Sequence, residues 1–397
     1  MLSPNMATPT RLRQPQIDDF RELTESAPGT PMGTLLRKFW QPVALSKELP
    51  PGAAIGVRIM NEDLTLYRGA SGQPYLVAQR CAHRGTDLRT GWIEGERIRC
   101  FYHGWKYDGT GQCIEQPAEQ GGFAPKVRIT SYPAREYAGL VLAYLGEGAP
   151  PATPRWPELE RGYGVQWNVK QIWPCNWFQR VENSMDGVHV SFVHREAPFG
   201  QAVTPVVPRL EYEETSFGLI QRAYRGAGNM RESHWQFPNC NHVVVPRADD
   251  AWNQVWADNF GWKVPVDDEH TVEFLITDVP VTGEAEQKLR RWVDQYSQYD
   301  PAQHHDELLR GTMPEQKSWM IPAQDYLAQV FQGTIADRSS EHLGKSDAGV
   351  ILMRKIFRRE LDAIKAGKPT KRWRQRFEPA DLPLPPGVSK EPVALSA

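Results

Sequence analysis

Hydrophobic and polar residues alternate with the two-residue period of β-strands through much of the first 150 residues. Strand-like runs such as VRIM, LTLYRG and YLVAQR, at 57–80, are separated by turn sequences, and a further run, GLVLAYLG, occupies 139–146. Short strands of this kind, bounded by Gly and Pro, are typical of small all-β domains. The pattern predicts an N-terminal segment at 1–36 and an all-β domain at 37–150.

The pattern changes in the stretch GEGAPPATPRWPEL, whose four prolines exclude helix and central strand and so indicate a linker. Beyond it, FGLIQRAYR and EFLITDV look like strands, whereas 282–299 and 350–366 carry apolar residues at helical spacing. These segments predict an α+β domain at 151–380, an antiparallel sheet with helices packed on it in a helix-grip arrangement. A Pro-rich tail at 381–397 is expected to be extended.

Composition and charge exclude several functional classes. Lys and Arg total 46 against 48 Asp and Glu, so the basic surface of a nucleic-acid-binding protein is not expected. The longest apolar run, AGLVLAYLG, is far shorter than the ~20 residues that span a bilayer. We therefore expect a cytoplasmic protein that binds neither nucleic acid nor membrane. Five cysteines, an odd number, argue against a disulfide framework and favour metal ligation.

Two Cys/His pairs stand in the all-β region. Cys81 and His83 form C-x-H, and sixteen residues later Cys100 and His103 form C-x-x-H; each pair follows a strand-like run and is followed by a glycine. The pairs could be chance neighbours in hairpin loops, or a structural zinc site with two thiolates and two imidazoles. We favour a [2Fe-2S] cluster with the cysteines on one iron and the histidines on the other, because neutral imidazoles raise the cluster's reduction potential.

A second group of polar residues lies in NWFQRVENSMDGVHVSFVHR, which we expect to be helical. Asp186 and His189 are three residues apart and share a helix face. His189 and His194 are five apart, so they can converge on one ion only across a π-type widening or a helix end. Two imidazoles with one carboxylate are the ligands of non-heme Fe(II), although both histidines could also be ordinary polar residues of an amphipathic helix.

The first group resembles the Rieske motif, and the second resembles the mononuclear-iron motif D-x-x-H-x-x-x-x-H of Rieske non-heme iron aromatic-ring-hydroxylating oxygenases. The resemblance runs from about Phe39 to Arg376, and QDYLAQVFQGTIADRSSEHLGKSD is similar to the phthalate-dioxygenase-like branch. It implies a catalytic (alpha) subunit that forms head-to-tail homotrimers or stacks of trimers. Such a terminal oxygenase uses O₂ and takes electrons from a separate NAD(P)H-dependent reductase, itself expected to contain flavin and [2Fe-2S].

The resemblance also implies roles for individual residues. The third iron ligand is expected to be Asp325, opening a helix, with Asp337 as the rival; alternatively Asp325 only caps that helix. Asp186 is expected to bridge the partner subunit's His103 and its own His189 and so carry electrons between subunits, with Asn183 beside it. The alternative is that Asp186 merely accepts backbone hydrogen bonds at a helix distortion.

The substrate is expected to be a small aromatic carboxylate such as a phthalate, chlorobenzoate or phenoxybenzoate, and the reaction cis-dihydroxylation. Phe199 and Trp252 are candidate pocket residues, and Arg180 and Arg247 are candidates for pairing with the carboxylate. No pair of arginines placed as in the phthalate enzymes stands out. The alternatives are a Rieske monooxygenase or aryl-ether O-demethylase, a non-catalytic Rieske electron carrier, and a zinc-stabilised binding protein.

Overall fold

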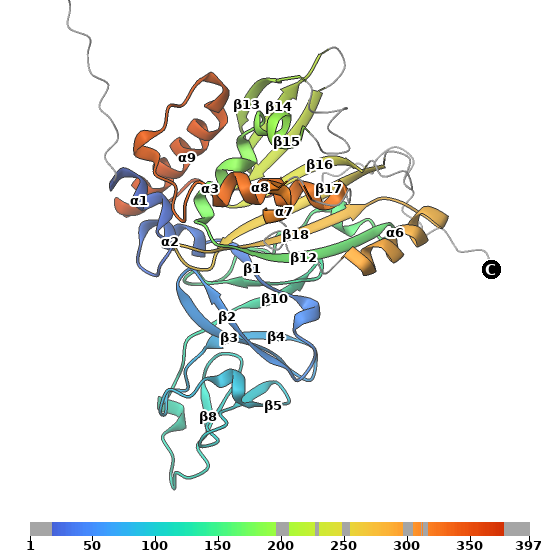
Figure 1. The fold of residues 1–397 in the computed structure, drawn as a ribbon. Helices are drawn as coiled ribbons and strands as arrows, with labels where there is room; N and C mark the ends of the chain where they lie inside the picture. Colours follow the sequence, from blue (N-terminus) through green and yellow to red (C-terminus); the bar gives the residue numbers. More distant parts are fainter. Residues whose placement is uncertain are drawn as a thin grey trace, which may run out of the picture.

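The structure is a computed structural model of the 397-residue chain, and it describes residues 18–195, 206–226, 230–247, 255–296, 305–310, 312 and 317–376. The predicted tail at 381–397 lies outside these residues. Figure 1 shows an elongated molecule, with small sheets at one end and one large sheet with its helices at the other. No helix in the described part of the chain is both long enough and apolar enough to cross a membrane.

Strands β1 to β11 form three small antiparallel sheets, as the alternating pattern predicts. Their orders are β1-β11-β10, β2-β3-β4-β9 and β5-β6-β7-β8. The third sheet has a small core of its own at the free end of the domain, around Cys81, Trp105 and Tyr107. The strands are β1 (Trp40–Leu45), β2 (Ala54–Ile59), β3 (Glu62–Arg68), β4 (Pro74–Ala78), β5 (Trp92–Glu94), β6 (Arg97–Arg99), β7 (Lys106–Tyr107), β8 (Cys113–Glu115), β9 (Ser131–Tyr132), β10 (Ala134–Tyr137) and β11 (Leu140–Tyr144).

A single antiparallel sheet of seven strands, in the order β12-β18-β17-β16-β15-β14-β13, forms the second part of the fold. The two runs predicted as strands are β14 and β18, so the α+β class is confirmed. The predicted division at residue 150 falls between the end of β11 and the start of β12. The strands are β12 (Val165–Trp173), β13 (Arg209–Glu214), β14 (Gly218–Tyr224), β15 (Met230–Gln236), β16 (Cys240–Arg247), β17 (Val255–Pro265) and β18 (Thr271–Val279).

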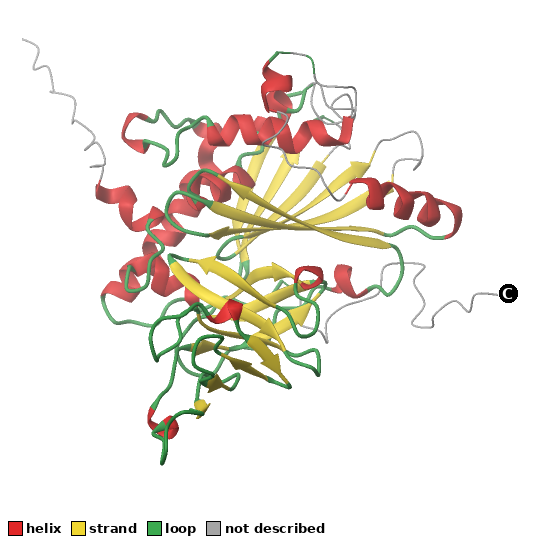
Figure 2. Cartoon of the chain, turned by 60° about the horizontal axis from the view of Figure 1, so that its bottom comes forward, coloured by secondary structure: helices red, strands yellow, loops and turns green. Residues whose placement is uncertain are grey.

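Helices cover one face of the large sheet, and the small sheets lie on its other side (Figure 2). The two segments with helical spacing correspond to α6 and α9. Helix α9 buries Met353, Ile356, Phe357 and Leu361, whose spacing of three to four residues places them on one side of the helix. The helices are α1 (Asp18–Thr24), α2 (Pro31–Arg37), α3 (Trp177–Glu182), α4 (His189–Val193), α6 (Gly283–Tyr296), α7 (His305–Leu309), α8 (Lys317–Val330) and α9 (Ala348–Lys365).

Candidate metal centres

The two Cys/His pairs lie on two loops that follow β4 and β6. In each loop a backbone N–H returns to the cysteine carbonyl, from Gly85 to Cys81 at 2.9 Å and from Gly104 to Cys100 at 3.1 Å. The two glycines have φ of 74° and 73°, the left-handed region that glycine adopts without a steric penalty. The glycine after each pair therefore closes the turn that presents the Cys and His side chains.

The four side chains from these loops meet at the free end of the small-sheet domain. Cys81 and Cys100 are each 2% exposed. The ring centroids of His83 and His103 are 4.5 Å apart, and His83 stacks on Trp105 at 4.6 Å. The buried Nδ1 of His83 has no hydrogen-bond partner among the described residues. A buried ring nitrogen without a partner is unfavourable unless it binds something else, so this arrangement fits a metal cluster.

Tyr107 supports the cysteine side of this site. Its hydroxyl oxygen accepts the N–H of Ala82 at 3.1 Å and lies 3.2 Å from Sγ of Cys81, to which the hydroxyl is free to donate. Burial raises the pKa of the Cys81 thiol, and the Tyr107 hydrogen bond opposes that effect. The hydroxyl would therefore stabilise a thiolate at Cys81.

The segment that carries the two catalytic-domain histidines was expected to be helical, and in the structure it is broken into two short helices. Helix α3 gives way to a 3₁₀ turn at Asn183–Met185, and α4 then begins at His189. The Asp186 carboxylate accepts the N–H groups of Val188 at 3.0 Å and His189 at 3.2 Å. A carboxylate that accepts the first N–H groups of a helix acts as a cap, because those groups have no partner within the helix. Asp186 therefore favours the start of a new helix at this point.

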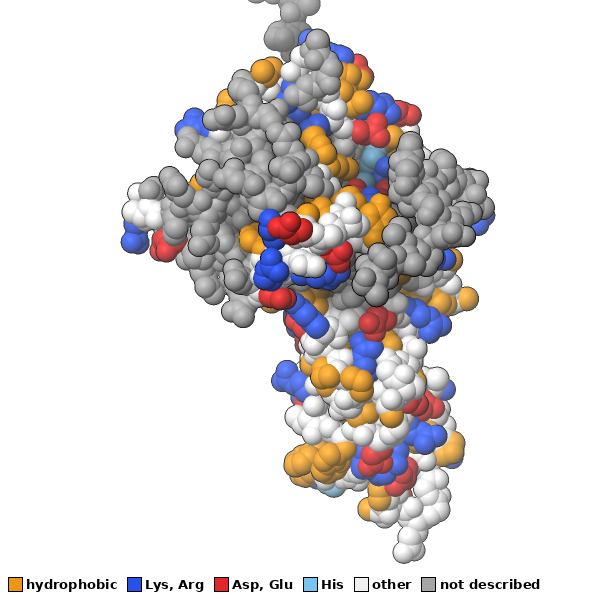
Figure 3. Space-filling view, turned by 90° about the vertical axis from the view of Figure 1, so that its right-hand side faces the viewer, with side chains coloured by type: hydrophobic (Ala, Val, Ile, Leu, Met, Phe, Trp, Pro, Cys, Tyr) orange, Lys and Arg blue, Asp and Glu red, His pale blue; other side chains and the backbone are white. Residues whose placement is uncertain are grey.

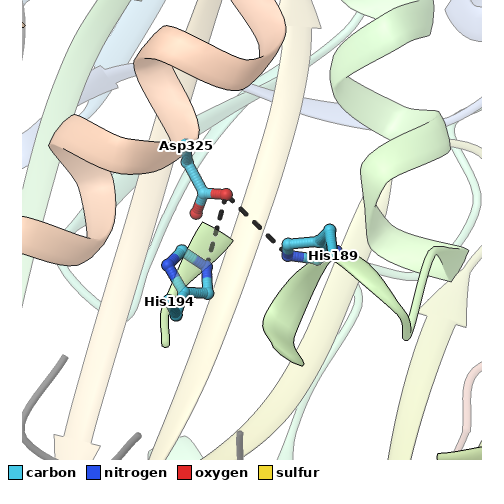
Figure 4. Close-up of side chains that lie close together, drawn as sticks. All are labelled: His189, His194 and Asp325. Atoms are coloured by element: carbon cyan, nitrogen blue, oxygen red, sulfur yellow. Dashed lines mark ion pairs between the residues drawn. The ribbon is translucent and has the colours of Figure 1, made fainter. Parts of the chain in front are cut away.

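The five-residue spacing of the histidines is resolved by a helix end, one of the two predicted solutions. Helix α4 ends at Val193, and His194 occupies its C-cap position. Figure 4 shows the two imidazoles turned toward Asp325 of α8. Oδ1 of Asp325 lies 3.8 Å from Nε2 of His189 and 3.5 Å from Nε2 of His194. The three ligand atoms all lie within 4.8 Å of one another, so a small closing movement would bring all three into the first coordination shell of one metal ion.

Both imidazoles have their Nδ1 atoms engaged elsewhere, which leaves Nε2 for a metal. Nδ1 of His194 lies 3.0 Å from Oε1 of Gln324, and Nδ1 of His189 is hydrogen-bonded to the backbone carbonyl of Asp186. Acceptors at Nδ1 fix the tautomer in which Nε2 carries the free lone pair. Sequence reasoning missed Gln324; its position next to the expected ligand Asp325 was the available signal.

The charges of the group favour an ionised carboxylate. Burial acts to raise the pKa of Asp325, and the charge and hydrogen bond of His194 act to lower it. His189 and Arg180 lower the pKa of Asp325 further, so it lies well below the usual range for aspartate. The same ion pair raises the pKa of His194, although burial opposes this. An ionised carboxylate between two imidazoles is the donor set of a non-heme Fe(II) site.

The position of Asp325 in its helix differs from the prediction. Helix α8 begins at Lys317, so Asp325 neither opens nor caps it. The rival Asp337 is exposed and instead caps a 3₁₀ turn, accepting the N–H of Ser339 at 2.9 Å and its hydroxyl at 2.6 Å. Pro322 lies inside α8, a position at which proline usually interrupts or starts a helix, so the observed helix begins earlier than predicted.

Asp186 and Asn183, the predicted electron-transfer residues, lie beside the triad. The Asp186 side chain is 37% exposed, and its Oδ2 is 3.9 Å from Nδ1 of His189. The expected hydrogen bond from the His189 ring to this carboxylate is therefore replaced by the bond to the Asp186 carbonyl. The Asn183 carbonyl accepts the Asp186 N–H at 3.2 Å. In this chain the Asp186 carboxylate caps α4, and its second oxygen is left for another donor.

The candidate substrate residues have different positions. Arg180 is 3% exposed; its guanidinium lies 2.5 Å from Oε2 of Glu273 and 3.4 Å from the ring centroid of Trp173. This buried ion pair accounts for Arg180 without a substrate. Arg247 ends β16, and its side chain lies outside the described part of the structure, as do Phe199 and Trp252.

A loop-borne set of two cysteines and two histidines, joined to a domain with a two-histidine, one-carboxylate site, defines the class of Rieske oxygenases. The Rieske [2Fe-2S] domain family matches residues 39–133. The chain is 33% identical over 366 residues to the 5,5'-dehydrodivanillate O-demethylase oxygenase subunit of Sphingobium sp. (strain NBRC 103272 / SYK-6), covering 88% of this chain and 81% of that protein. It is 32% identical over 371 residues to phenoxybenzoate dioxygenase subunit alpha of Ectopseudomonas oleovorans, covering 87% and 85%.

The fold agrees with these relatives. The crystal structure of dicamba monooxygenase bound to dicamba superposes with a TM-score of 0.62 at 17% identity, covering 84% of this chain and all of that one. The chain belongs to the Rieske non-heme iron aromatic oxygenases, as a catalytic subunit of the dioxygenase and O-demethylase type. It is an oxidoreductase that incorporates oxygen.

Proposed function

We propose that this chain is the terminal oxygenase of a multicomponent system that oxidises a small aromatic carboxylate. Cys81, His83, Cys100 and His103 would hold the [2Fe-2S] cluster. The observation that carries the proposal is the convergence of His189, His194 and Asp325 within 4.8 Å, with Nε2 of both imidazoles free. A mononuclear Fe(II) bound there would supply the site for O₂ activation next to the substrate.

The protein's own residues would set the geometry of this chemistry. Gln324 and the Asp186 carbonyl hold the two imidazole rings in place. His194 is buried, whereas His189 and Asp325 are partly exposed, which leaves one side of the triad open to substrate and O₂. At the Cys/His loops, the Tyr107 hydroxyl lies against Cys81 and the Trp105 ring stacks on His83, so these two residues would hold the cluster ligands in place. Electrons would come from a separate NAD(P)H-dependent reductase, a partner suggested by the relatives that are named as oxygenase subunits.

We also propose that electrons cross between subunits of a homotrimer, through Asp186. Within one chain the Cys/His loops lie at the far end of the molecule from the helices over the large sheet (Figure 1). The partly exposed Asp186 carboxylate has one oxygen that makes no hydrogen bond to the described residues of its own chain. A histidine from a partner subunit could donate to that oxygen.

The reaction type has two candidates. The relative named phenoxybenzoate dioxygenase supports cis-dihydroxylation of an aromatic carboxylate, whereas the relative named O-demethylase supports removal of a methyl group from an aryl ether. Both use the same pair of metal sites. A panel of phenoxybenzoate, chlorobenzoate, phthalate and methoxybenzoate substrates distinguishes them, because only demethylation releases formaldehyde.

The proposal is tested by metal content and O₂ consumption. We expect the purified protein to bind iron at both sites and to consume O₂ with a reductase and one of these substrates. His189→Ala, His194→Ala and Asp325→Ala should each lose the mononuclear iron and all turnover but keep the visible spectrum of the cluster. Zinc in place of iron, or wild-type turnover in Asp325→Ala, would overturn it.

A further inference from the structure

Two arginines on the large sheet carry charges that the described residues do not neutralise. Arg225 directly follows β14, is 8% exposed, and has no hydrogen-bond partner among the described residues at either Nε or Nη1. Arg231 of β15 donates from Nη2 to the backbone carbonyl of Val244 at 2.6 Å. Burial lowers the pKa of Arg225, and burial together with the charge of Arg225 lowers the pKa of Arg231 to about 10.

This arrangement is unfavourable for the protein alone. A buried guanidinium is normally paired with a carboxylate, because the loss of hydration otherwise costs several kcal/mol. Arg180 shows the ordinary solution in this chain, since its buried guanidinium is paired with Glu273. Arg231 pairs across the strands with Ala223, two residues before Arg225 and on the same face, so Arg225 and Arg231 are close enough for repulsion to add to desolvation. An anion bound between them would relieve both effects.

Arg225 points to the side of the sheet that carries the iron site. Along β14 and the residue after it, Gln221, Ala223 and Arg225 are buried, whereas Arg222 and Tyr224 are partly exposed. Alternate side chains of a strand point to opposite faces, so the three buried residues share one face. Arg222 lies on the other face, where it forms ion pairs with Glu213 and Glu232.

The segment with the iron-site histidines runs along this buried face. At one end, a Cβ atom added to Gly187 would lie 2.7 Å from Oε1 of Gln221, so the chain before α4 touches the sheet there. Further along, Ser191 of α4 donates to the carbonyl of Val206, which precedes β13. The first residue of β13 pairs with the last residue of β14, so Ser191 lies near the level of Arg225. Helix α4 thus extends from the level of Gln221 toward Arg225.

We propose that Arg225 and Arg231 bind the carboxylate of the substrate and so orient its ring toward the His189, His194 and Asp325 triad. This inference rests on the proposed function and names the residues that would recognise the carboxylate of its substrate. A guanidinium presents a planar fork of donors that matches the two oxygens of a carboxylate. Arg225 follows β14 and Arg231 lies in the neighbouring β15. Because these strands belong to one sheet, the two arginines would hold the carboxylate in a fixed position.

The test compares charged and neutral ligands on the iron-loaded protein. Calorimetric titration would measure the affinity of benzoate, phthalate and 3-phenoxybenzoate and of their carboxamides. We expect at least one carboxylate to bind about 10-fold or more tightly than its amide, the range for hydrogen bonds to charged groups. Arg225→Gln and Arg231→Gln should remove that preference, and Arg225→Lys should restore part of it.

Arg222→Gln is the matched control, because it removes an arginine from the same strand on the opposite face and should leave the preference unchanged. Without ligand, Arg225→Gln should be at least as heat-stable as the wild type, since it removes a buried charge that has no carboxylate partner among the described residues. A purely structural role predicts the reverse: a lower melting temperature and an unchanged carboxylate preference.

The outcomes separate this inference from the proposed function. Equal affinity for carboxylates and amides in the wild-type protein, or a preference that survives in Arg225→Gln, would overturn the inference even if aromatic compounds are oxygenated. A carboxylate preference that depends on Arg225, without O₂ consumption under any reducing system, would overturn the proposed oxygenase function and leave the binding site established.

Discussion

Asp186→Asn separates the capping role that the structure shows for this carboxylate from the bridging role that we propose for it. One oxygen of Asp186 caps α4 through the N–H groups of Val188 and His189, and the other is available to a partner subunit. Asparagine caps helices about as well as aspartate, whereas alanine at such a position costs roughly 1 kcal/mol. We therefore expect Asp186→Asn to unfold at the wild-type temperature and Asp186→Ala to unfold a few degrees lower.

Both substitutions remove the negative charge and should impair electron transfer alike. Loss of an outer-shell partner of a metal ligand typically costs 10- to 100-fold in activity, and we expect a loss of about 100-fold because two sites depend on this residue. The assay is a single turnover of pre-reduced enzyme mixed with O₂ and substrate, followed through reoxidation of the cluster absorbance. Iron content and reduction by the reductase serve as controls and should be unchanged.

The refuting result is specific. If Asp186→Asn reoxidises its cluster at the wild-type rate and forms product, then the carboxylate acts only as a helix cap, and the bridging role is wrong. If Asp186→Ala alone is slow, the defect lies in the position of α4, since only that variant loses the cap.

Three further predictions follow from single contacts. Tyr107→Phe should lower the reduction potential of the cluster in a redox titration, because the hydroxyl 3.2 Å from Cys81 Sγ stabilises the added negative charge; an unchanged potential would show that it does not donate to sulfur. Gln324→Leu should weaken iron binding about 10- to 100-fold in chelator competition, since it removes the acceptor at His194 Nδ1, and should leave the cluster spectrum intact. Burial lowers the pKa of His234 to about 4, below its ordinary 6.5, so protonation favours unfolding; urea stability should fall from pH 6.5 to 4, less steeply in His234→Gln.

The sequence predicted which side chains come together in the two candidate metal centres better than it predicted their surroundings. Spacing and residue type were enough for the two Cys/His pairs, and the family resemblance led to Asp325. The sequence left two interpretations of Asp186, a member of a helix face or an acceptor of backbone hydrogen bonds at a helix distortion, and the structure shows it accepting the N–H groups of Val188 and His189. The position of the break, just before His189, was not predicted. Capping depends on backbone angles that residue spacing does not reveal.

The pair formed by Arg225 and Arg231 could not be predicted from the sequence, for a different reason. Arg225 ended a predicted strand, whereas the residues around Arg231 were not assigned to any predicted strand. The two arginines come together only through the pairing of β14 with β15. Whether a charged side chain has an ion-pair partner depends on the three-dimensional structure, because the partner often comes from a distant part of the sequence. Arg180 looked equally suitable from the sequence and is already paired with Glu273.

The two metal sites draw on the chain in very different ways. The four candidate cluster ligands fall between residues 81 and 103, whereas the candidate iron triad needs Asp325 from α8 to reach His189 and His194. During synthesis the first site is therefore complete long before the second. A preparation in which α8 is misplaced or truncated would still be coloured, so the absorbance of the cluster measures how much protein has matured at one end of the molecule and says nothing of how much is competent for catalysis.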